Sequence, residues 1–128
     1  LAHQKNLRVV PLVGPSSILL ALMASGLNGQ RFVFHGYLPV EKSKRIKTIV
    51  ELERDSIARD QTQIFIETPY RNQKLLESLV STCHDDTVLC VACNLTLASE
   101  YISTRTVKEW KSTLPNLNNK PAIFLLQG

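Results

Sequence analysis

The sequence predicts an α/β domain in which a mixed sheet forms the middle of three layers. Two observations lead to this fold class. Apolar, β-rich segments alternate with segments of helical periodicity along most of the 128 residues, which is typical of layered α/β domains. The last apolar segment, Ala122 to Leu126, contains no polar residue, as expected for a central strand that is covered on both faces. A chain of this length with 44% hydrophobic residues can bury the core of one domain.

Near the N-terminus, a candidate strand from Val9 to Val13 leads through a turn directly into a helix. Gly14 allows a sharp bend because it has no Cβ, and Pro15 suits the first helical turn, where its missing N–H is no loss. Ser16 and Ser17 can offer hydroxyl groups at the helix N-terminus, where exposed N–H groups favour an anionic or strongly polar ligand group. An ordinary strand-to-helix turn is the alternative to a ligand site.

The helix expected from Ser16 to Ser25 is apolar on nearly all sides, and Gly26 is placed to end it. A helix without a polar face is buried on several sides. Such a helix suits the junction between two domains, and it equally suits the centre of a single domain.

The next three predicted elements are a strand, a long helix and a second strand. The first strand spans Phe32 to Tyr37, and Leu38-Pro39 ends it. Helical spacing of apolar residues from Glu41 to Asp60 predicts a long amphipathic helix. The stripe expected to face the core comprises Ile46, Ile49, Val50, Glu53 and Ile57. The second strand is expected from Thr62 to Glu67.

A further helix and two further strands follow. Pro69 can open the helix. Its apolar face comprises Leu75, Leu76, Leu79, Val80 and Cys83. Strands are expected at Thr87 to Cys93 and at Tyr101 to Thr104, and a short connection pairs the second with the first.

A short helix is expected from Thr106 to Trp110. Thr106 can cap it, and Glu109, three residues after the cap, can complete a capping box. A loop from Leu114 to Lys120 then leads to the final strand.

Composition narrows the range of partners. The formal net charge of +4 and a pI near 9.1 are mildly basic, which permits an RNA partner without requiring one. No apolar run approaches the roughly 18 to 20 residues of a membrane span, so we expect no membrane partner. The first residues lack a cationic segment followed by an apolar one, so no secretory signal is visible.

The three cysteines are predicted to be buried thiols. Cys90 and Cys93 form a C-x-x-C pattern inside a predicted strand, where positions three apart face opposite sides of the sheet. A redox pair belongs at a helix N-terminus, and a zinc site would need two further ligands, for which only His84 is near in sequence. We therefore expect no metal site and a reducing, cytoplasmic location.

Polar side chains follow three of the predicted strands, in the loops 14–17, 67–71 and 94–96. Ligands of open α/β sheets bind beyond the carboxyl ends of the strands, in the loops that lead to helices. These three loops are therefore the candidate ligand-binding segments of the chain.

Several motifs occur in an order and spacing that resemble a known enzyme family. They are Pro11-Leu-Val-Gly-Pro-Ser-Ser, Ala24-Ser-Gly-Leu27, Phe34-His-Gly-Tyr-Leu-Pro39, Phe65-Ile-Glu-Thr-Pro-Tyr-Arg71 and Ala92-Cys-Asn-Leu-Thr96. With the last strand, they make almost the whole chain similar to the tetrapyrrole-methylase family of S-adenosylmethionine-dependent methyltransferases. Within that family, the chain looks like the ribosomal RNA small-subunit methyltransferase I group, which 2′-O-methylates a cytidine of 16S rRNA.

The resemblance implies that S-adenosyl-L-methionine is the methyl donor and that it lies in a cleft between two domains. The family's Pro-Gly-Pro-Ser/Cys-Ala turn matches Val13 to Ser17 of this chain. By such matches, the resemblance assigns cofactor contact to Gly14, Pro15, Ser16, Ser17, Ile18, Glu67, Thr68, Asn94 and Ala122. It assigns no catalytic base.

The resemblance also implies that the basic segment after Gly36-Tyr-Leu-Pro39 contacts phosphates of rRNA. The cations concerned are Lys42, Lys44, Arg45, Lys47 and Arg71. Without the resemblance, the same charges are interpreted as the solvated face of a helix, with Glu41 and Glu51 nearby.

Several positions depart from the family pattern. The family's Ala-Arg-Glu-Leu-Thr-Lys is Ala92 to Leu97 here, so Asn94 replaces a glutamate. The family's Gly-Glu before the last strand is Pro121-Ala122, and Tyr70 replaces a histidine. Three hypotheses follow. The chain can belong to an rRNA methyltransferase acting on the 30S subunit, to a methyltransferase of a tetrapyrrole or corrin precursor, or to a non-catalytic paralogue of the same fold.

The family's first domain has no counterpart in these residues, so we expect the chain to be a C-terminal part of the enzyme. Residues 1–26 would be the last strand of the absent N-terminal domain and the linking helix, and residues 27–128 would be the C-terminal α/β methyltransferase domain. The surfaces that face the absent domain predict self-association, with a homodimer as the expected assembly.

Overall fold

The structure is a computed structural model, which describes residues 15–95 and 97–128. Its helices are α1 (Pro15–Ser25), α2 (Lys42–Arg59), α3 (Asn72–Thr82) and α4 (Val107–Ser112), and a 3-10 turn, η1 (Pro69–Arg71), precedes α3. Its strands are β1 (Phe32–Tyr37), β2 (Thr62–Ile66), β3 (Val88–Cys93), β4 (Tyr101–Thr106) and β5 (Ala122–Gln127). Every element predicted within this range is present, in the predicted order. The strand predicted at Val9 to Val13 and the turn at Gly14 lie outside the described residues.

The five strands form one mixed sheet in the order β1-β2-β5-β3-β4. β1 and β2 are parallel, whereas β5 is antiparallel to both of its neighbours, β2 and β3. β3 and β4 pair antiparallel, with Cys93 opposite Tyr101. β5 therefore lies at the centre of the sheet, which confirms the prediction from its uninterrupted apolar sequence.

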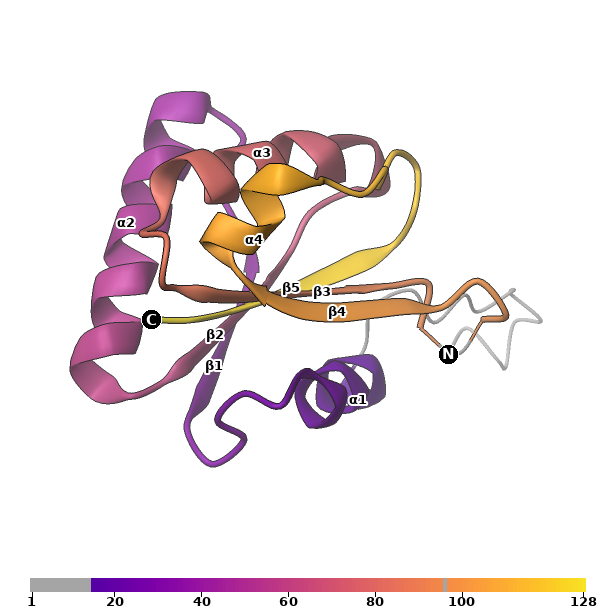
Figure 1. The fold of residues 1–128 in the computed structure, drawn as a ribbon, viewed down its shortest axis with the longest axis horizontal. Helices are drawn as coiled ribbons and strands as arrows, with labels where there is room; N and C mark the ends of the chain where they lie inside the picture. Colours follow the sequence, from indigo (N-terminus) through magenta and orange to yellow (C-terminus); the bar gives the residue numbers. More distant parts are fainter. Residues whose placement is uncertain (1–14, 96) are drawn as a thin grey trace, which may run out of the picture.

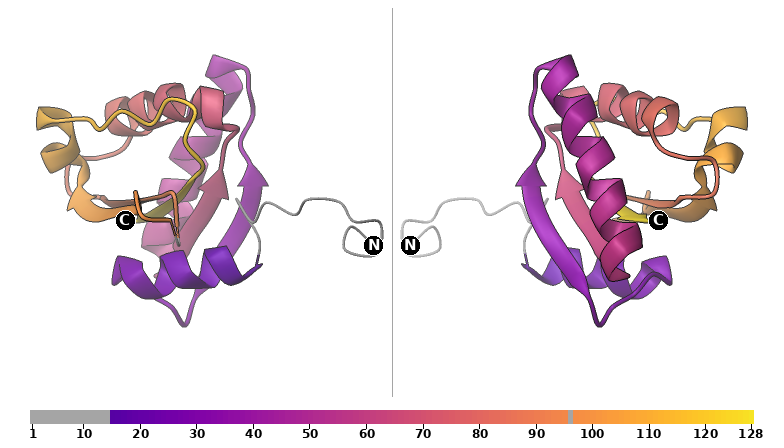
Figure 2. Two further views of the ribbon diagram at one scale, coloured as in Figure 1. Left: turned by 90° about the vertical axis from the view of Figure 1, so that its right-hand side faces the viewer. Right: turned by 90° about the vertical axis from the view of Figure 1, so that its left-hand side faces the viewer.

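Helices cover both faces of the sheet and give the three predicted layers (Figure 1). α1 lies against one face, and α2, α3 and α4 lie against the other (Figure 2). Ala21 and Leu22 of α1 pack against the apolar side chains of β2, β3 and β5. On the opposite face, Trp110 of α4 is fully buried, and its indole N–H donates to the carbonyl oxygen of Leu89 at 2.8 Å. Each face of the sheet thus has its own apolar cluster.

Cys90 and Cys93 face opposite sides of the sheet, as predicted. Cys90 lies in the cluster beneath α1, whereas Cys93 lies in the cluster on the side of α2, α3 and α4. Both are free and buried, as is Cys83. The two thiols of the C-x-x-C pattern therefore cannot bind one ligand together.

The stripe predicted on α2 is wrong by about one residue. Val50 and Ile57 were expected in the core, but they are exposed by 39% and 56%. The buried residues of α2 are instead Arg45, Ile49, Leu52, Glu53 and Ser56. The helix is rotated relative to its apolar pattern because three of its buried side chains are polar and have hydrogen-bond partners.

Among the residues that the structure describes, α1 is covered on one side only. Ala21 and Leu22 are buried, but Leu19, Leu20 and Met23 are exposed, Met23 by 80%. The helix ends where predicted, since Gly26 follows it with a φ of 75°. In the part of the chain that the structure describes, no helix, α1 included, has the length and apolar character needed to cross a membrane.

Candidate functional site

Four of the predicted cofactor residues lie at one end of the strands of the sheet. β2 and β3 run in the same direction on either side of β5, so their carboxyl ends flank the start of β5. Glu67 follows β2, Asn94 follows β3, and Ala122 is the first residue of β5, opposite Cys93. We term this end of the three strands, with residues 67–68, 94 and 122, the strand-end edge.

Glu67 has a carboxylate whose orientation is fixed by the residues that follow it. Its side chain is 2% exposed, and Oε1 accepts a hydrogen bond from the backbone N–H of Thr68 at 2.7 Å. The Thr68 hydroxyl donates to the same oxygen at 3.4 Å, and the guanidinium of Arg71 lies 3.8 Å away. The strand-end edge therefore holds one oriented carboxylate and one threonine hydroxyl.

Asn94 adopts a left-handed backbone conformation with a φ of 52°, which asparagine tolerates better than most residues. Its backbone N–H donates to the carbonyl oxygen of Pro121 at 3.0 Å and so ties the end of β3 to the start of β5. Its side-chain amide donates to Oγ of Ser99 at 3.2 Å. Asn94 also lines a hollow of about 180 Å³ at this edge, together with Cys93, Ser99, Tyr101, Pro115, Asn116, Leu117 and Lys120.

The predicted cofactor residues at the start of α1 are described only in part. Gly14 lies outside the described residues, as do the side chains of Pro15 and Ser16. Ser17 is buried, and Ile18 packs against the apolar cluster beneath the sheet. Ser17 and Ile18 thus contribute to the packing of α1, and their contact with a cofactor stays a prediction.

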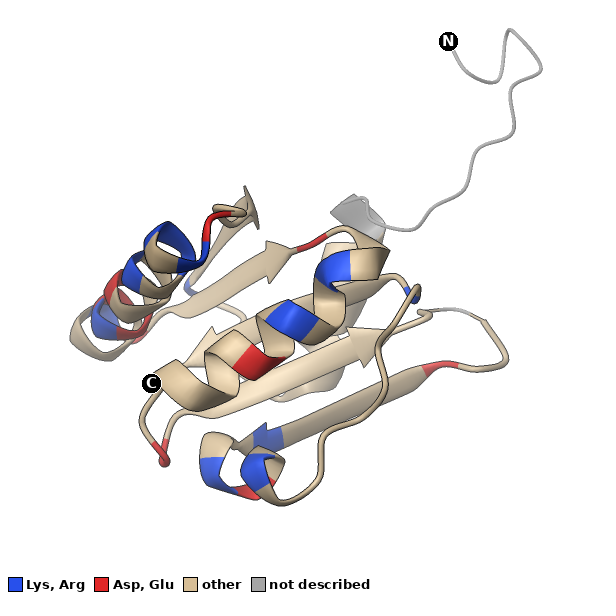
Figure 3. Cartoon of the chain, turned by 90° about the horizontal axis from the view of Figure 1, so that it is seen from above, with Lys and Arg blue, Asp and Glu red and all other residues tan. Residues whose placement is uncertain are grey.

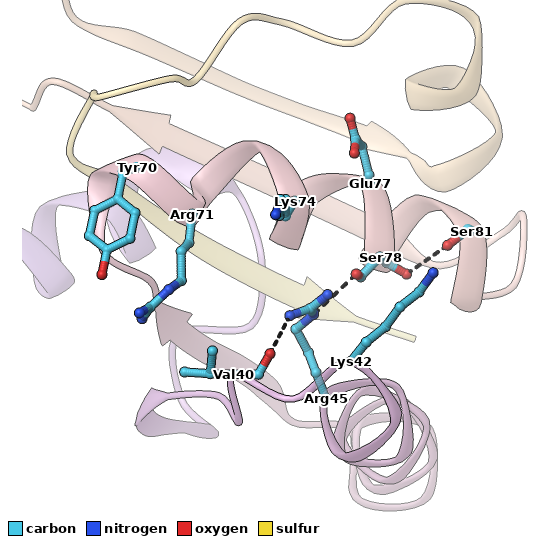
Figure 4. Close-up of a pocket in the computed structure, with 9 residues that line it drawn as sticks. All are labelled: Val40, Lys42, Arg45, Tyr70, Arg71, Lys74, Glu77, Ser78 and Ser81. Carbon is cyan, nitrogen blue, oxygen red and sulfur yellow. Dashed lines mark hydrogen bonds between the residues drawn. The ribbon is translucent and has the colours of Figure 1, made fainter.

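The cations predicted to contact RNA separate into two groups. Lys42, Arg45 and Arg71 line a groove of about 690 Å³ between the start of α2 and the segment η1–α3 (Figure 4). Lys44 and Lys47 are exposed residues outside it, and Nζ of Lys44 lies 3.7 Å from a carboxylate oxygen of Glu41. We term the lining set the basic groove: Val40, Lys42, Arg45, Tyr70, Arg71, Lys74, Glu77, Ser78 and Ser81.

Sequence reasoning missed Tyr70 and Lys74 as members of this groove. A signal for Lys74 was present, because Arg71, Lys74 and Ser78 recur at spacings of three and four residues, which places them on one side of a helix. The contact of that side with the start of α2 is non-local, and no local pattern predicts it.

The chain is similar to known proteins in its sequence and in its fold. No family model matches the chain. Over 98% of the chain, 30% of residues are identical to the ribosomal RNA small subunit methyltransferase I of Vibrio cholerae, and 29% to that of Haemophilus influenzae. The protein of the same name from Mesorhizobium japonicum is 35% identical over 84% of the chain.

The chain is a homologue of the ribosomal RNA small subunit methyltransferase I proteins. It spans 43% of the Vibrio cholerae protein, 44% of the Haemophilus influenzae protein and 35% of the Mesorhizobium japonicum protein. The chain thus corresponds to less than half the length of these methyltransferases.

Solved structures give the same fold. The methyltransferase CobJ superposes with a TM-score of 0.56 at 17% identity, over 87% of this chain and 47% of that one. The cobalamin biosynthetic enzyme cobalt precorrin-4 methyltransferase, CbiF, also gives a TM-score of 0.56, at 18% identity, over 94% of this chain and 52% of that one. These likenesses confirm the predicted fold, that of the tetrapyrrole methylases.

Proposed function

We propose that this chain is part of an enzyme that transfers a methyl group from S-adenosyl-L-methionine to the RNA of the small ribosomal subunit. The observation that carries the proposal is the alignment with the Vibrio cholerae ribosomal RNA small subunit methyltransferase I, which includes 98% of the chain at 30% identity. The fold shared with two further methyltransferases supports the same reaction class.

In this proposal, the strand-end edge forms one wall of the methyl-donor site. Its polar groups are the Glu67 carboxylate, the Thr68 hydroxyl and the Asn94 amide. Groups of these kinds hydrogen-bond the hydroxyls and the base of a nucleoside, so they fit the adenosine part of S-adenosyl-L-methionine. Ala122 would allow the methyl donor to approach the backbone closely, since its small side chain is buried at the start of β5.

When bound, S-adenosyl-L-methionine supplies an electrophilic methyl group, whose transfer depends on alignment and exclusion of water. The residues of this chain would therefore bind and orient the methyl donor. Asn94 cannot act as a general base in place of the glutamate of the family pattern, because an amide does not take up a proton near neutral pH. We assign no catalytic base to this chain.

The proposal includes the arrangement of the complete enzyme. Residues 1–26 would be the last strand of an N-terminal domain and the linking helix, and residues 27–128 would form the C-terminal domain. The exposed apolar side chains of Leu19, Leu20 and Met23 on α1 support this division, because such a surface is normally covered. The complete enzyme would be a homodimer.

Methyl transfer to ribosomal subunits tests the proposal. The full-length protein would be incubated with tritium-labelled S-adenosyl-L-methionine and 30S subunits from a strain that lacks this methyltransferase. We expect label in 16S rRNA. If the acceptor is the 2′ oxygen of a cytidine, as we propose, the label should survive alkaline hydrolysis in a dinucleotide, since a methylated 2′ oxygen cannot cleave its neighbouring phosphodiester.

Two outcomes would contradict the proposal at different levels. Label in an alkali-sensitive mononucleotide would reject the 2′-oxygen acceptor and retain rRNA methylation. Absence of label in the 30S subunit, together with transfer to a corrin precursor, would replace the RNA substrate with a tetrapyrrole.

A further inference from the structure

The basic groove combines cations from two elements that are far apart in sequence. Lys42 and Arg45 come from the start of α2, whereas Arg71 and Lys74 come from η1 and α3. Figure 3 shows basic residues in the segment η1–α3 and along α2, with acidic residues among them, on the side of the molecule seen from above. Among the lining residues, the only carboxylate is that of Glu77, and it points away from α2 (Figure 4). The groove is therefore positively charged.

Arg45 is a buried cation whose partners are neutral. The residue is 8% exposed, its Nε donates to Oγ of Ser78 at 3.1 Å, and a terminal nitrogen donates to the carbonyl oxygen of Val40 at 2.9 Å. Within residues 15–95 and 97–128, no carboxylate lies at ion-pair distance from Arg45. A guanidinium has five N–H donors, and a buried charge without a counter-ion is costly. A bound anion would supply both an acceptor and the missing negative charge.

Tyr70 and Arg71 add an aromatic surface next to these cations. Tyr70 is 62% exposed, and the guanidinium of Arg71 lies 4.7 Å from the centre of its ring. Exposed rings beside basic grooves bind single-stranded nucleic acids by stacking on the bases. Arg71 also lies 3.8 Å from the Glu67 carboxylate, so the groove borders the strand-end edge.

We propose, on the basis of the proposed function, that the basic groove binds the sugar–phosphate backbone of a single RNA strand. Phosphates contact Lys42, Arg45 and Lys74, and one base stacks on Tyr70. The ring beside the cations favours RNA over an acidic peptide, because bases stack on it. The strand then runs from the groove toward the strand-end edge, where the methyl donor is proposed to bind.

RNA binding by the full-length protein tests the groove without any methyl donor. The probe is a fluorescein-labelled single-stranded RNA of about 12 nucleotides, followed by fluorescence anisotropy. The groove variant carries Lys42→Gln and Lys74→Gln. The matched control carries Arg54→Gln and Lys108→Gln, which remove the same charge from exposed positions outside the groove. All four side chains are exposed, so both variants are expected to fold.

We expect the groove variant to bind the RNA about twentyfold more weakly at about 0.1 M salt, with a salt slope smaller by about 1.4, because two phosphate contacts are lost. The control should weaken binding by less than about threefold, because a distant exposed charge is screened. Tyr70→Ala should weaken binding about tenfold, whereas Tyr70→Phe should retain it, because phenylalanine still stacks.

Three results would overturn the proposal: an unchanged groove variant, an equal loss in groove and control variants, or displacement of the RNA by poly-glutamate as readily as by unlabelled RNA. Because the assay contains no methyl donor, it also separates the two proposals. Failure of methyl transfer with intact RNA binding at the groove counts against the proposed function alone.

Discussion

At the scale of single residues, Glu53 organises the connection between α3 and β3. Its carboxylate accepts hydrogen bonds from the backbone N–H of His84 at 2.8 Å and from the hydroxyl of Thr87, and it lies 3.0 Å from Nδ1 of His84. Glu53→Ala would remove the acceptor of the buried Thr87 hydroxyl and of the partly buried backbone N–H of His84. We predict a decrease of about 2–4 kcal/mol in the free energy of unfolding, measured by urea denaturation. Glu51→Ala, at an exposed position of the same helix, should change it by less than about 0.5 kcal/mol, and equal effects would contradict the prediction.

The thiols are predicted to be inert in the folded chain. Burial, followed by the negative charge of Glu53, raises the pKa of Cys83 to about 12, and burial raises the pKa values of Cys90 and Cys93. Because the thiolate is the reactive form, we expect no reaction with Ellman's reagent at about pH 8 and full titration after denaturation.

The raised pKa of Cys83 also determines how the stability of the folded chain depends on pH. Since the folded pKa of Cys83 is raised from 9.0, its contribution to stability is complete below about pH 9 and is lost as the pH rises toward about 12.

For the prediction of inert thiols, rapid modification of the folded chain by Ellman's reagent at about pH 8 would be the contradicting result, because it would show that solvent reaches the thiols.

At the scale of elements, α4 depends on its capping box, which the sequence predicts and the structure confirms. Oγ1 of Thr106 accepts from the backbone N–H of Glu109 at 3.2 Å, and the Glu109 carboxylate accepts from the backbone N–H of Thr106 at 3.0 Å. Thr106→Ala should lower the free energy of unfolding by about 1 kcal/mol, whereas Thr106→Ser should retain most of it. Equal losses in the alanine and serine variants would show that the hydroxyl is not the stabilising group.

The capping box also predicts an acid dependence. The hydrogen bonds from Thr106 lower the pKa of Glu109 below 4.5. The stabilisation is therefore present above the unfolded pKa and is lost as the pH falls through the folded value. Glu109→Gln should make thermal unfolding less sensitive to acidification, and an unchanged acid dependence would contradict this role.

The elements could be predicted from the sequence because their signals are local. The apolar run of β5, the spacing of Leu75, Leu76 and Leu79 on α3, and the cap of α4 each depend on neighbouring residues. The rotation of α2 could not be predicted, since it depends on Arg45 reaching Ser78 and on Glu53 reaching His84, which lie 33 and 31 residues away. The basic groove depends on the same contact between α2 and α3. The sequence therefore predicted the cations Lys42, Arg45 and Arg71, but neither Lys74 nor the grouping of the four.

At the scale of the whole molecule, the exposed side of α1 predicts self-association of the isolated chain. Leu19, Leu20 and Met23 would be covered by the remainder of the enzyme, and in its absence we expect a second copy of the chain to cover them. Sedimentation velocity should show a dimer or larger species, and the variant Leu20→Glu with Met23→Glu should be monomeric. Val50→Glu, an exposed apolar position on the other face, is the matched control and should leave the association unchanged.

The proposed two-domain cleft makes a prediction about cofactor affinity. The strand-end edge offers Glu67, Thr68 and Asn94 to one side of a nucleoside, and the other side would be contacted by the part of the enzyme that this chain does not include. We therefore expect the isolated chain to bind S-adenosyl-L-methionine at least about a hundredfold more weakly than the full-length protein, which corresponds to about 2.7 kcal/mol. Calorimetric titration of both proteins measures the difference. Equal affinities would mean that the strand-end edge forms the whole site, and the proposal of a cleft shared by two domains would then be wrong.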